Sequence, residues 1–143
     1  MEKKVMYKLS NADDFKQKKI LVVGGGNSAV ESAVDLVARR RGNQIEFRPP
    51  DEINEVTLVV RGGFTNDIKF PNKQKLYHCI DEGKIKVYWN TGVKEVRESE
   101  VVLMDPFTKE EKATVANDEI LALIGGDRPT TFLKQVGISI PEP

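Results

Sequence analysis

Three consecutive glycines between an apolar run and an amphipathic segment are the residues of this sequence best suited to bind a ligand. The stretch reads Ile20-Leu21-Val22-Val23-Gly24-Gly25-Gly26-Asn27-Ser28-Ala29-Val30-Glu31. In a turn from strand to helix, Gly24 permits the tight bend, Gly26 lets the backbone approach a pyrophosphate, and Ala29 lets the helix pack closely against the strand. The free amides at the start of that helix, where its dipole is positive, would hold the phosphates. The pattern predicts a dinucleotide-binding site; the alternative is a tight turn without a ligand.

Side chains beside these glycines add candidate contacts. We expect the Ser28 hydroxyl to contact the phosphates. Asn27 has two open roles, as a cofactor contact or as the helix N-cap, because Asn is among the best N-capping residues. Glu31 lies in the first turn, where a carboxylate also interacts favourably with the helix dipole. The predicted contacts of the turn are Gly24, Gly25, Gly26, Asn27, Ser28, Ala29 and Glu31.

A basic residue follows the next apolar run, 56–60, and bears on the choice of coenzyme. An acidic side chain at the end of this second strand would bind a ribose 2′-hydroxyl and select NAD, whereas a guanidinium can hold a 2′-phosphate with two hydrogen bonds. Arg61 therefore favours NADPH, with NADH possible. Lys69 and Lys73 are the nearest further cations, and for either alone we expect a solvated surface charge.

The last apolar run, 120–124, also ends in glycines. Ile124, Gly125 and Gly126 would lie at the carboxyl edge of a parallel sheet, where ligands bind, and would allow the backbone to approach the nicotinamide ribose. His78 and Cys79 are the only histidine and cysteine, which excludes an internal disulfide or a Cys-x-x-Cys pair and makes a metal cluster unexpected. We assign no catalytic or metal-binding residue.

Hydrophobic periodicity predicts the elements that position these groups. Buried strands are expected over 20–23, 56–60 and 120–124, a half-buried strand over 85–90, and an edge strand or linker over 5–9. Helices are expected over 27–41, with Gly42 as a C-cap, and over 70–81. Short strands over 93–97, 101–104 and 113–115 predict an antiparallel meander. The prolines at 49 and 50 favour a surface insertion over 43–55.

Three other side chains receive structural expectations. Cys79 would face the core from the second helix, as an inert thiol, and His78 would lie on the surface. Trp89 is expected to be a packing group within its strand rather than a stacking platform.

Length and charge limit the classes of function. The 143 residues suit one domain. The sequence holds 22 Lys and Arg against 22 Asp and Glu, so its charge gives no reason to expect nucleic acid or an anionic membrane as a partner. It lacks a run long enough to span a membrane and an N-terminal secretory signal, so we expect a cytoplasmic location.

The order of these motifs resembles the pyridine-nucleotide subdomain of the two-dinucleotide-domain flavoproteins, the pyridine nucleotide-disulfide oxidoreductases. It is most similar to the thioredoxin reductase branch and to bacillithiol-disulfide-reductase-like proteins. The resemblance spans residues 18–138 and rests on four ordered motifs: Gly24 to Glu31, Arg61-Gly62 after its strand, Thr91-Gly92-Val93-Lys94-Glu95-Val96, and Gly125-Gly126-Asp127-Arg128-Pro129.

The resemblance implies a Rossmann-like three-layer α/β domain, a parallel sheet with an antiparallel β-meander crossover. It implies NAD(P)H binding on behalf of an FAD-dependent oxidoreductase, with hydride passing from nicotinamide to flavin. By the same resemblance, the Glu31 carboxylate reaches toward the nicotinamide end. The implied partners are NAD(P)H and the FAD domain of a parent chain, with a possible homodimer.

Some family features are missing from this sequence. A second glycine motif for FAD is absent, so we expect FAD to be bound by the parent protein and not by this chain. The expected organisation is a lead-in segment or linker over 1–17, the NAD(P)H-binding domain over 18–128, and a tail over 129–143 that resembles the return to a missing FAD domain. Disulfide reduction is unsupported, and Gly62 and Asn66 stand where the family commonly has further Arg. The isolated chain is expected to bind without turning over.

Two other classes of function share parts of this pattern. A regulatory nucleotide-sensing module without redox chemistry is the main rival, but such modules often carry an acidic residue where this sequence has Arg61. A complete small Rossmann reductase is the other, and a Tyr-x-x-x-Lys acid/base pair to support it is missing.

Overall fold

A five-stranded parallel sheet forms the centre of the fold in the computed structural model, which describes residues 5–9, 11–42, 44–62, 68–123 and 137–139. Its order is β1-β10-β2-β5-β6, and each neighbouring pair is parallel. The strands are β1 (Val5–Met6), β2 (Lys19–Val23), β5 (Glu55–Val59), β6 (Ile85–Tyr88) and β10 (Glu119–Ala122). The predicted α/β class is confirmed, and 5–6 form an edge strand.

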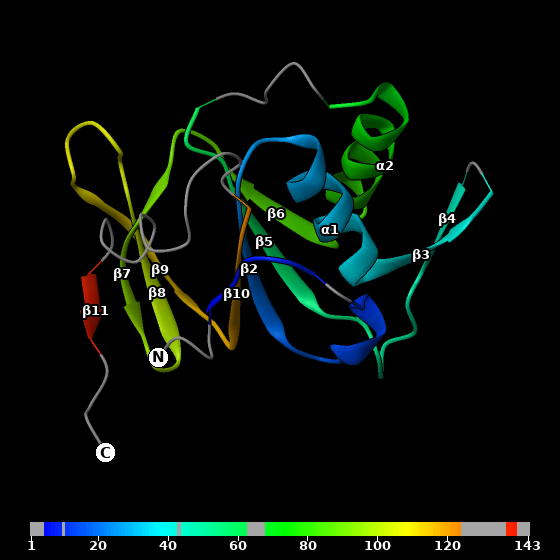
Figure 1. Cartoon of the computed structure of the whole chain (residues 1–143), viewed down its shortest axis with the longest axis horizontal. Helices are drawn as coiled ribbons and strands as arrows, with labels where there is room; N and C mark the ends of the chain where they lie inside the picture. The colour runs from blue at the N-terminus through cyan, green and yellow to red at the C-terminus, as the bar shows by residue number, and fades with distance from the viewer. Residues whose placement is uncertain (1–4, 10, 43, 63–67, 124–136, 140–143) are drawn as a thin grey trace.

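Two helices and an antiparallel meander cover the two faces of this sheet (Figure 1). Helices α1 (Asn27–Val37) and α2 (Phe70–Asp81) pack on one face. The other face carries β7 (Gly92–Arg97), β8 (Glu100–Met104) and β9 (Glu111–Ala116), with β11 (Gly137–Ser139) parallel to β7. A short 3-10 helix, η2 (Ala12–Asp14), precedes β2. The three predicted layers and the meander crossover are therefore present.

The core lies in two parts because alternate strand residues face opposite sides of the sheet. On the helix side, strand residues such as Ile20 and Leu58 pack against α1 and α2. On the meander side, residues such as Leu21 and Val59 pack against β7 and β8. Both faces of β2 are thus buried, which explains why its sequence is a continuous apolar run rather than an alternating one.

Helix α1 ends earlier than the sequence predicts. The helix stops at Val37, and β3 (Ala38–Arg41) pairs antiparallel with β4 (Gln44–Phe47). Gly42 is therefore not a helix C-cap; its φ of +65° serves the turn between these strands. Within the expected surface insertion, residues 44–47 form the second strand of a hairpin that projects from the end of α1 (Figure 1).

A buried arginine explains where the helix ends. Arg48 donates from Nε and Nη2 to the Asp35 carbonyl at 3.1 and 2.8 Å, and from Nη1 to the Asp13 carboxylate at 2.7 Å. Its backbone N–H donates to the Val37 carbonyl at 2.9 Å. These bonds satisfy carbonyls at the C-terminus of α1 from outside the helix, which removes the need for a glycine cap.

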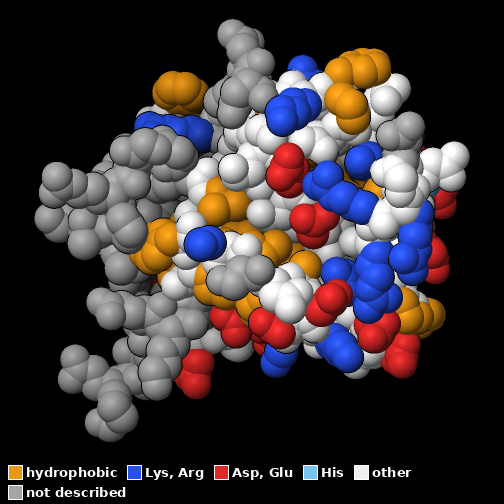
Figure 2. Space-filling view, turned by 45° about the vertical axis from the view of Figure 1, so that its right-hand side comes forward, with side chains coloured by type: hydrophobic (Ala, Val, Ile, Leu, Met, Phe, Trp, Pro, Cys, Tyr) orange, Lys and Arg blue, Asp and Glu red, His pale blue; other side chains and the backbone are white. Residues whose placement is uncertain are grey.

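Charged side chains on and around this hairpin form ion pairs rather than patches of like charge. Arg40 binds Asp35 and Arg41 binds Glu46, at 3.2 and 3.0 Å. Figure 2 shows basic and acidic side chains intermingled on the face that it presents. Such exposed pairs contribute little to stability individually.

The remaining elements match the predicted ranges closely. Helix α2 spans 70–81 as expected, with Pro71 in its first turn. Strand β6 ends at Tyr88, so the prediction that placed Trp89 within a strand was wrong. Among the described helices, none has the length and apolar character needed to cross a membrane.

Candidate dinucleotide-binding site

Gly24 lies at the carboxyl end of β2, between the strands on either side of it. Its N–H donates to the Val59 carbonyl of β5 at 3.0 Å, while Leu123 N–H, just after β10, donates to the Val23 carbonyl at 2.8 Å. After β2 the chain passes through α1 and continues to β5 on one side of β2. Strand β10, which comes later in the chain, lies on the other side of β2. In open α/β sheets, such a switch in strand order is where ligands bind.

No side chain fits at Gly24. Its φ is +146°, and a Cβ built there would lie 2.5 Å from the Leu123 carbonyl oxygen and 3.2 Å from the Ala29 Cβ. Ala29 is itself fully buried. A bend of this kind is nearly specific to glycine, and the small residue at 29 lets α1 begin close to β2, as predicted.

The first turn of α1 presents backbone amides without a capping side chain. Gly26 is the N-cap residue and provides no side-chain cap, and its carbonyl accepts the first helical bond from Val30 N–H at 3.2 Å. Ser28 is exposed on this turn, and Gly25 is half-buried. A helix start with this arrangement suits an anion, so the residues present fit a pyrophosphate.

Asn27 is not the N-cap, because it is the first residue of α1 and its side chain binds elsewhere. Its Oδ1 accepts from Lys69 N–H at 3.1 Å and from Asn72 Nδ2 at 2.9 Å. Its Nδ2 donates to Glu31 Oε1 at 3.0 Å. The side chain thus connects the start of α1 with the start of α2.

Asn72 completes a cluster with Asn27 and Glu31 that sequence reasoning missed. Its Nδ2 also donates to Glu31 Oε1 at 3.0 Å, and Asn72 is only 5% exposed. The carboxylate of Glu31 therefore receives two amide hydrogen bonds and is held toward α2. The signal was available in the sequence: Asn72 lies four residues before the buried Leu76, on the same helix face.

Arg61 lies just beyond β5, at the same edge of the sheet as Gly24, and is exposed. Within the described ranges its side chain forms neither a hydrogen bond nor an ion pair. Val60, the residue before it, is tied to the next strand, since its N–H donates to the Tyr88 carbonyl at 3.0 Å. The guanidinium is thus available at the position where a ribose substituent was predicted.

Three predicted contacts, Ile124, Gly125 and Gly126, lie outside the described residues.

The two residues with reactive side chains have structural surroundings. Cys79 is fully buried, as expected, and burial raises the pKa of its thiol to about 12. His78 is exposed, as expected, and its ring stacks on Phe47 of β4 at 5.3 Å between centroids. Among the described residues, no group of three or more His, Cys, Asp or Glu is arranged to hold a metal ion.

The sequence of this chain is similar to that of a known reductase. The curated bacilliredoxin reductase Bdr of Bacillus subtilis (strain 168) is 26% identical over 138 residues, which are 96% of this chain and 38% of that protein. The chain therefore spans less than half the length of this relative.

Solved structures show the same likeness. The bacillithiol disulfide reductase Bdr (YpdA) from Staphylococcus aureus has a TM-score of 0.70 and 27% identity, over 98% of this chain and 39% of that one. The thioredoxin reductase from Lactococcus lactis, in its FR conformation, has a TM-score of 0.63 and 25% identity, over 90% and 39%.

A family model described as pyridine nucleotide-disulphide oxidoreductase matches residues 1–142. The match includes every strand and helix described above. The chain belongs to the pyridine nucleotide-disulphide oxidoreductase family.

Proposed function

We propose that this chain is the NAD(P)H-binding unit of a flavoprotein oxidoreductase of the thioredoxin reductase type. In this role residues 18–128 bind the nicotinamide coenzyme, and FAD belongs to another part of the parent protein. When both cofactors are bound, the coenzyme supplies hydride to the flavin. The final electron acceptor of the parent lies outside this proposal.

The observation that carries the proposal is the turn at Gly24. Its positive φ and its closeness to Leu123 O leave room for backbone alone, and the uncapped start of α1 follows directly. Backbone N–H groups at a helix start bind phosphate without a charged side chain. The family match and the switch in strand order at β2 support the same position.

In the proposed complex some residues bind the coenzyme and Glu31 supports them. The amides after Gly24 hold the pyrophosphate, with the exposed Ser28 hydroxyl beside them. Arg61, one strand away, holds the 2′-phosphate of NADPH through charge-assisted hydrogen bonds. Glu31 is fixed by Asn27 and Asn72, so it keeps the start of α1 in place.

Calorimetric titration with NADPH and with NADH tests this proposal. We expect tighter binding of NADPH, and Arg61→Ala should weaken NADPH binding about tenfold while leaving NADH binding nearly unchanged, since one charge-assisted contact is lost. Arg41→Ala is a matched control, because Arg41 is also an exposed arginine but pairs with Glu46 on the hairpin. The proposal is wrong if neither coenzyme binds at millimolar concentration.

A further inference from the structure

Trp89 lies at the carboxyl edge of the central sheet, directly after β6. Arg61, which is predicted to bind the ribose 2′-phosphate, follows the neighbouring strand β5. Val59 and Tyr88 are register partners at the ends of β5 and β6. The pairing continues beyond both strands, because Thr91 N–H donates to the Val60 carbonyl at 3.0 Å. Val60 N–H also donates to the Tyr88 carbonyl at 3.0 Å, so Val60 is the residue that lies opposite Trp89. Arg61 comes one residue later, at the same edge of the sheet.

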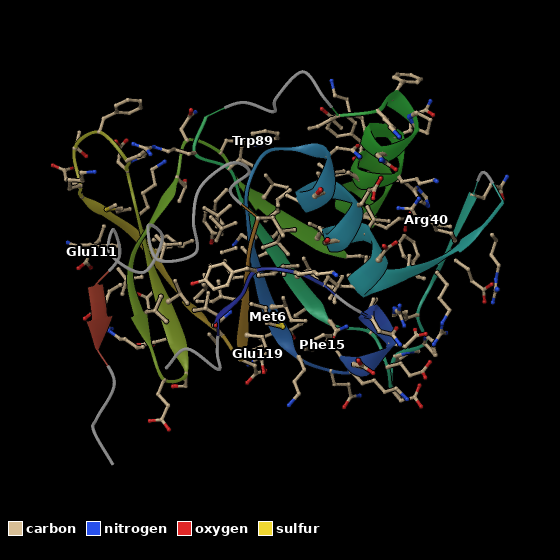
Figure 3. The ribbon with its side chains drawn as sticks, viewed as in Figure 1. Met6, Phe15, Arg40, Trp89, Glu111 and Glu119 are labelled. Atoms are coloured by element: carbon tan, nitrogen blue, oxygen red, sulfur yellow. The ribbon has the colours of Figure 1, made fainter. Side chains whose placement is uncertain are left out.

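The indole of Trp89 is accessible at this edge. Trp89 is the only tryptophan of the sequence, and it is 40% exposed. Figure 3 shows it at the upper end of the sheet, near the level at which β2 turns into α1. A large aromatic ring at the ligand-binding edge of a parallel sheet is the kind of surface on which a planar base stacks.

The backbone that carries this ring is held in one conformation. The Thr91 hydroxyl donates to the Trp89 carbonyl at 2.7 Å, and Asn90 has a φ of +50°. From the meander, Lys112 Nζ donates to the Asn90 carbonyl at 2.9 Å and to Thr91 Oγ1 at 3.2 Å. A ring on a backbone fixed in this way loses little entropy when a ligand binds.

We propose that Trp89 is the stacking platform for the adenine base of the nucleotide, an inference that rests on the proposed function. The strand order β2-β5-β6 follows the order of groups in the ligand. The pyrophosphate lies over the turn after β2, the 2′-substituted ribose lies at Arg61 after β5, and the base lies at Trp89 after β6. This reverses the sequence-based expectation of a packing role.

The stacking has a direct spectroscopic readout, because all tryptophan fluorescence of this chain comes from Trp89. We expect adenosine 2′,5′-bisphosphate, which contains the base and the 2′-phosphate without nicotinamide, to quench this emission as it saturates the site. Nicotinamide mononucleotide, which lacks adenine, should leave the emission unchanged. In the nuclear magnetic resonance spectrum of the bound ligand, the adenine protons should shift upfield through the ring current of the indole.

Calorimetry with NADPH and three variants tests the energetic contribution. Trp89→Ala should weaken binding roughly tenfold, as expected for the loss of one base–aromatic stack, whereas Trp89→Phe should stay within about threefold of the wild type. Phe107→Ala is the control, since Phe107 is an 83% exposed aromatic residue between β8 and β9, away from the strand ends.

The possible failures are distinguishable. If NADPH binds but Trp89→Ala binds equally well and the adenine compound leaves the emission unchanged, the platform is overturned and the proposed function stands. If calorimetry detects no binding of either coenzyme to the wild type, the proposed function and the platform both fail.

Discussion

The carbonyl oxygen of Leu123 lies 2.5 Å from the position that a Cβ on Gly24 would occupy. Two strands on either side of β2 thus meet the glycine turn: β5 through the hydrogen bond from Gly24 N–H to Val59, and β10 through the residue that follows it. The turn is packed by backbone on both sides. Its shape is therefore a property of the folded sheet and not of the loop alone.

Gly24→Ala should destabilise the fold by about 2 kcal/mol or more, because the methyl group meets backbone and the φ of +146° is unfavourable for alanine. Urea unfolding followed by circular dichroism measures the change. Gly62→Ala is the control, since a Cβ there meets nothing within 4 Å. Equal unfolding midpoints for wild type and Gly24→Ala would contradict the close packing.

Asn72→Ala should lower the free energy of unfolding by about 1–3 kcal/mol, since two partly buried acceptors, on Asn27 and Glu31, lose a donor. The same urea experiment measures it. Gln74→Ala on the exposed face of α2 is the comparison. A loss no larger than that of Gln74→Ala would show that the cluster contributes nothing.

Asp13→Asn should remove part of the acid sensitivity of the protein. The hydrogen bond from Arg48 holds the pKa of the Asp13 carboxyl below its ordinary value of 3.8. Because the folded-state pKa is lowered, the stabilisation is fully present above the unfolded-state pKa and is lost as pH falls through the folded-state value. Wild type should therefore be more stable than Asp13→Asn near neutral pH, and the difference should shrink as the pH falls below the ordinary pKa of 3.8.

Unfolding midpoints of both proteins across this pH range test the prediction. Asp14→Asn provides the adjacent carboxyl as a control, since Asp14 is also exposed and follows Asp13 in η2. A difference between wild type and Asp13→Asn that stays constant from neutral to acid pH would argue against the lowered pKa.

Cys79 should resist alkylation in the native protein. Its thiol is fully buried, and its pKa of about 12 leaves almost no thiolate at neutral pH. Iodoacetamide should label it only after denaturant is added, which mass spectrometry of the intact chain would show. Complete labelling of the native protein within minutes would mean that this helix opens readily or that the thiol is not buried.

The sequence predicts the central sheet well because β2 and β10 are buried on both faces. The continuous apolar run of β2 and the proline and glycine that bound α2 are local signals, and local signals determined those elements. The meander was predicted from alternation and turn residues. The glycine turn was recognisable because apolar residues precede it and a periodic helix follows.

The errors come from contacts between distant residues. Basic residues followed by Gly42 resemble a helix C-terminus, yet α1 ends at Val37 because Arg48 satisfies its carbonyls from beyond the hairpin. Of the two roles left open for Asn27, the N-cap is excluded, because its side chain binds Lys69 and Asn72 at the start of the next helix. Local patterns contain no information about such partners.

The hairpin β3–β4 begins and ends at one place, because Arg48 N–H binds the Val37 carbonyl at 2.9 Å. Residues 38–47 thus form a loop between α1 and β5 whose two ends lie next to each other. Ala38 lies in the core on the helix side of the sheet, and Ile45 and Phe47 pack against it, so the base of the hairpin is part of the domain. A change in length between Arg40 and Gln44 leaves these contacts, β2 and β5 in place. The outer part of this hairpin is therefore a place where chain length can vary during evolution, and where a label can be inserted.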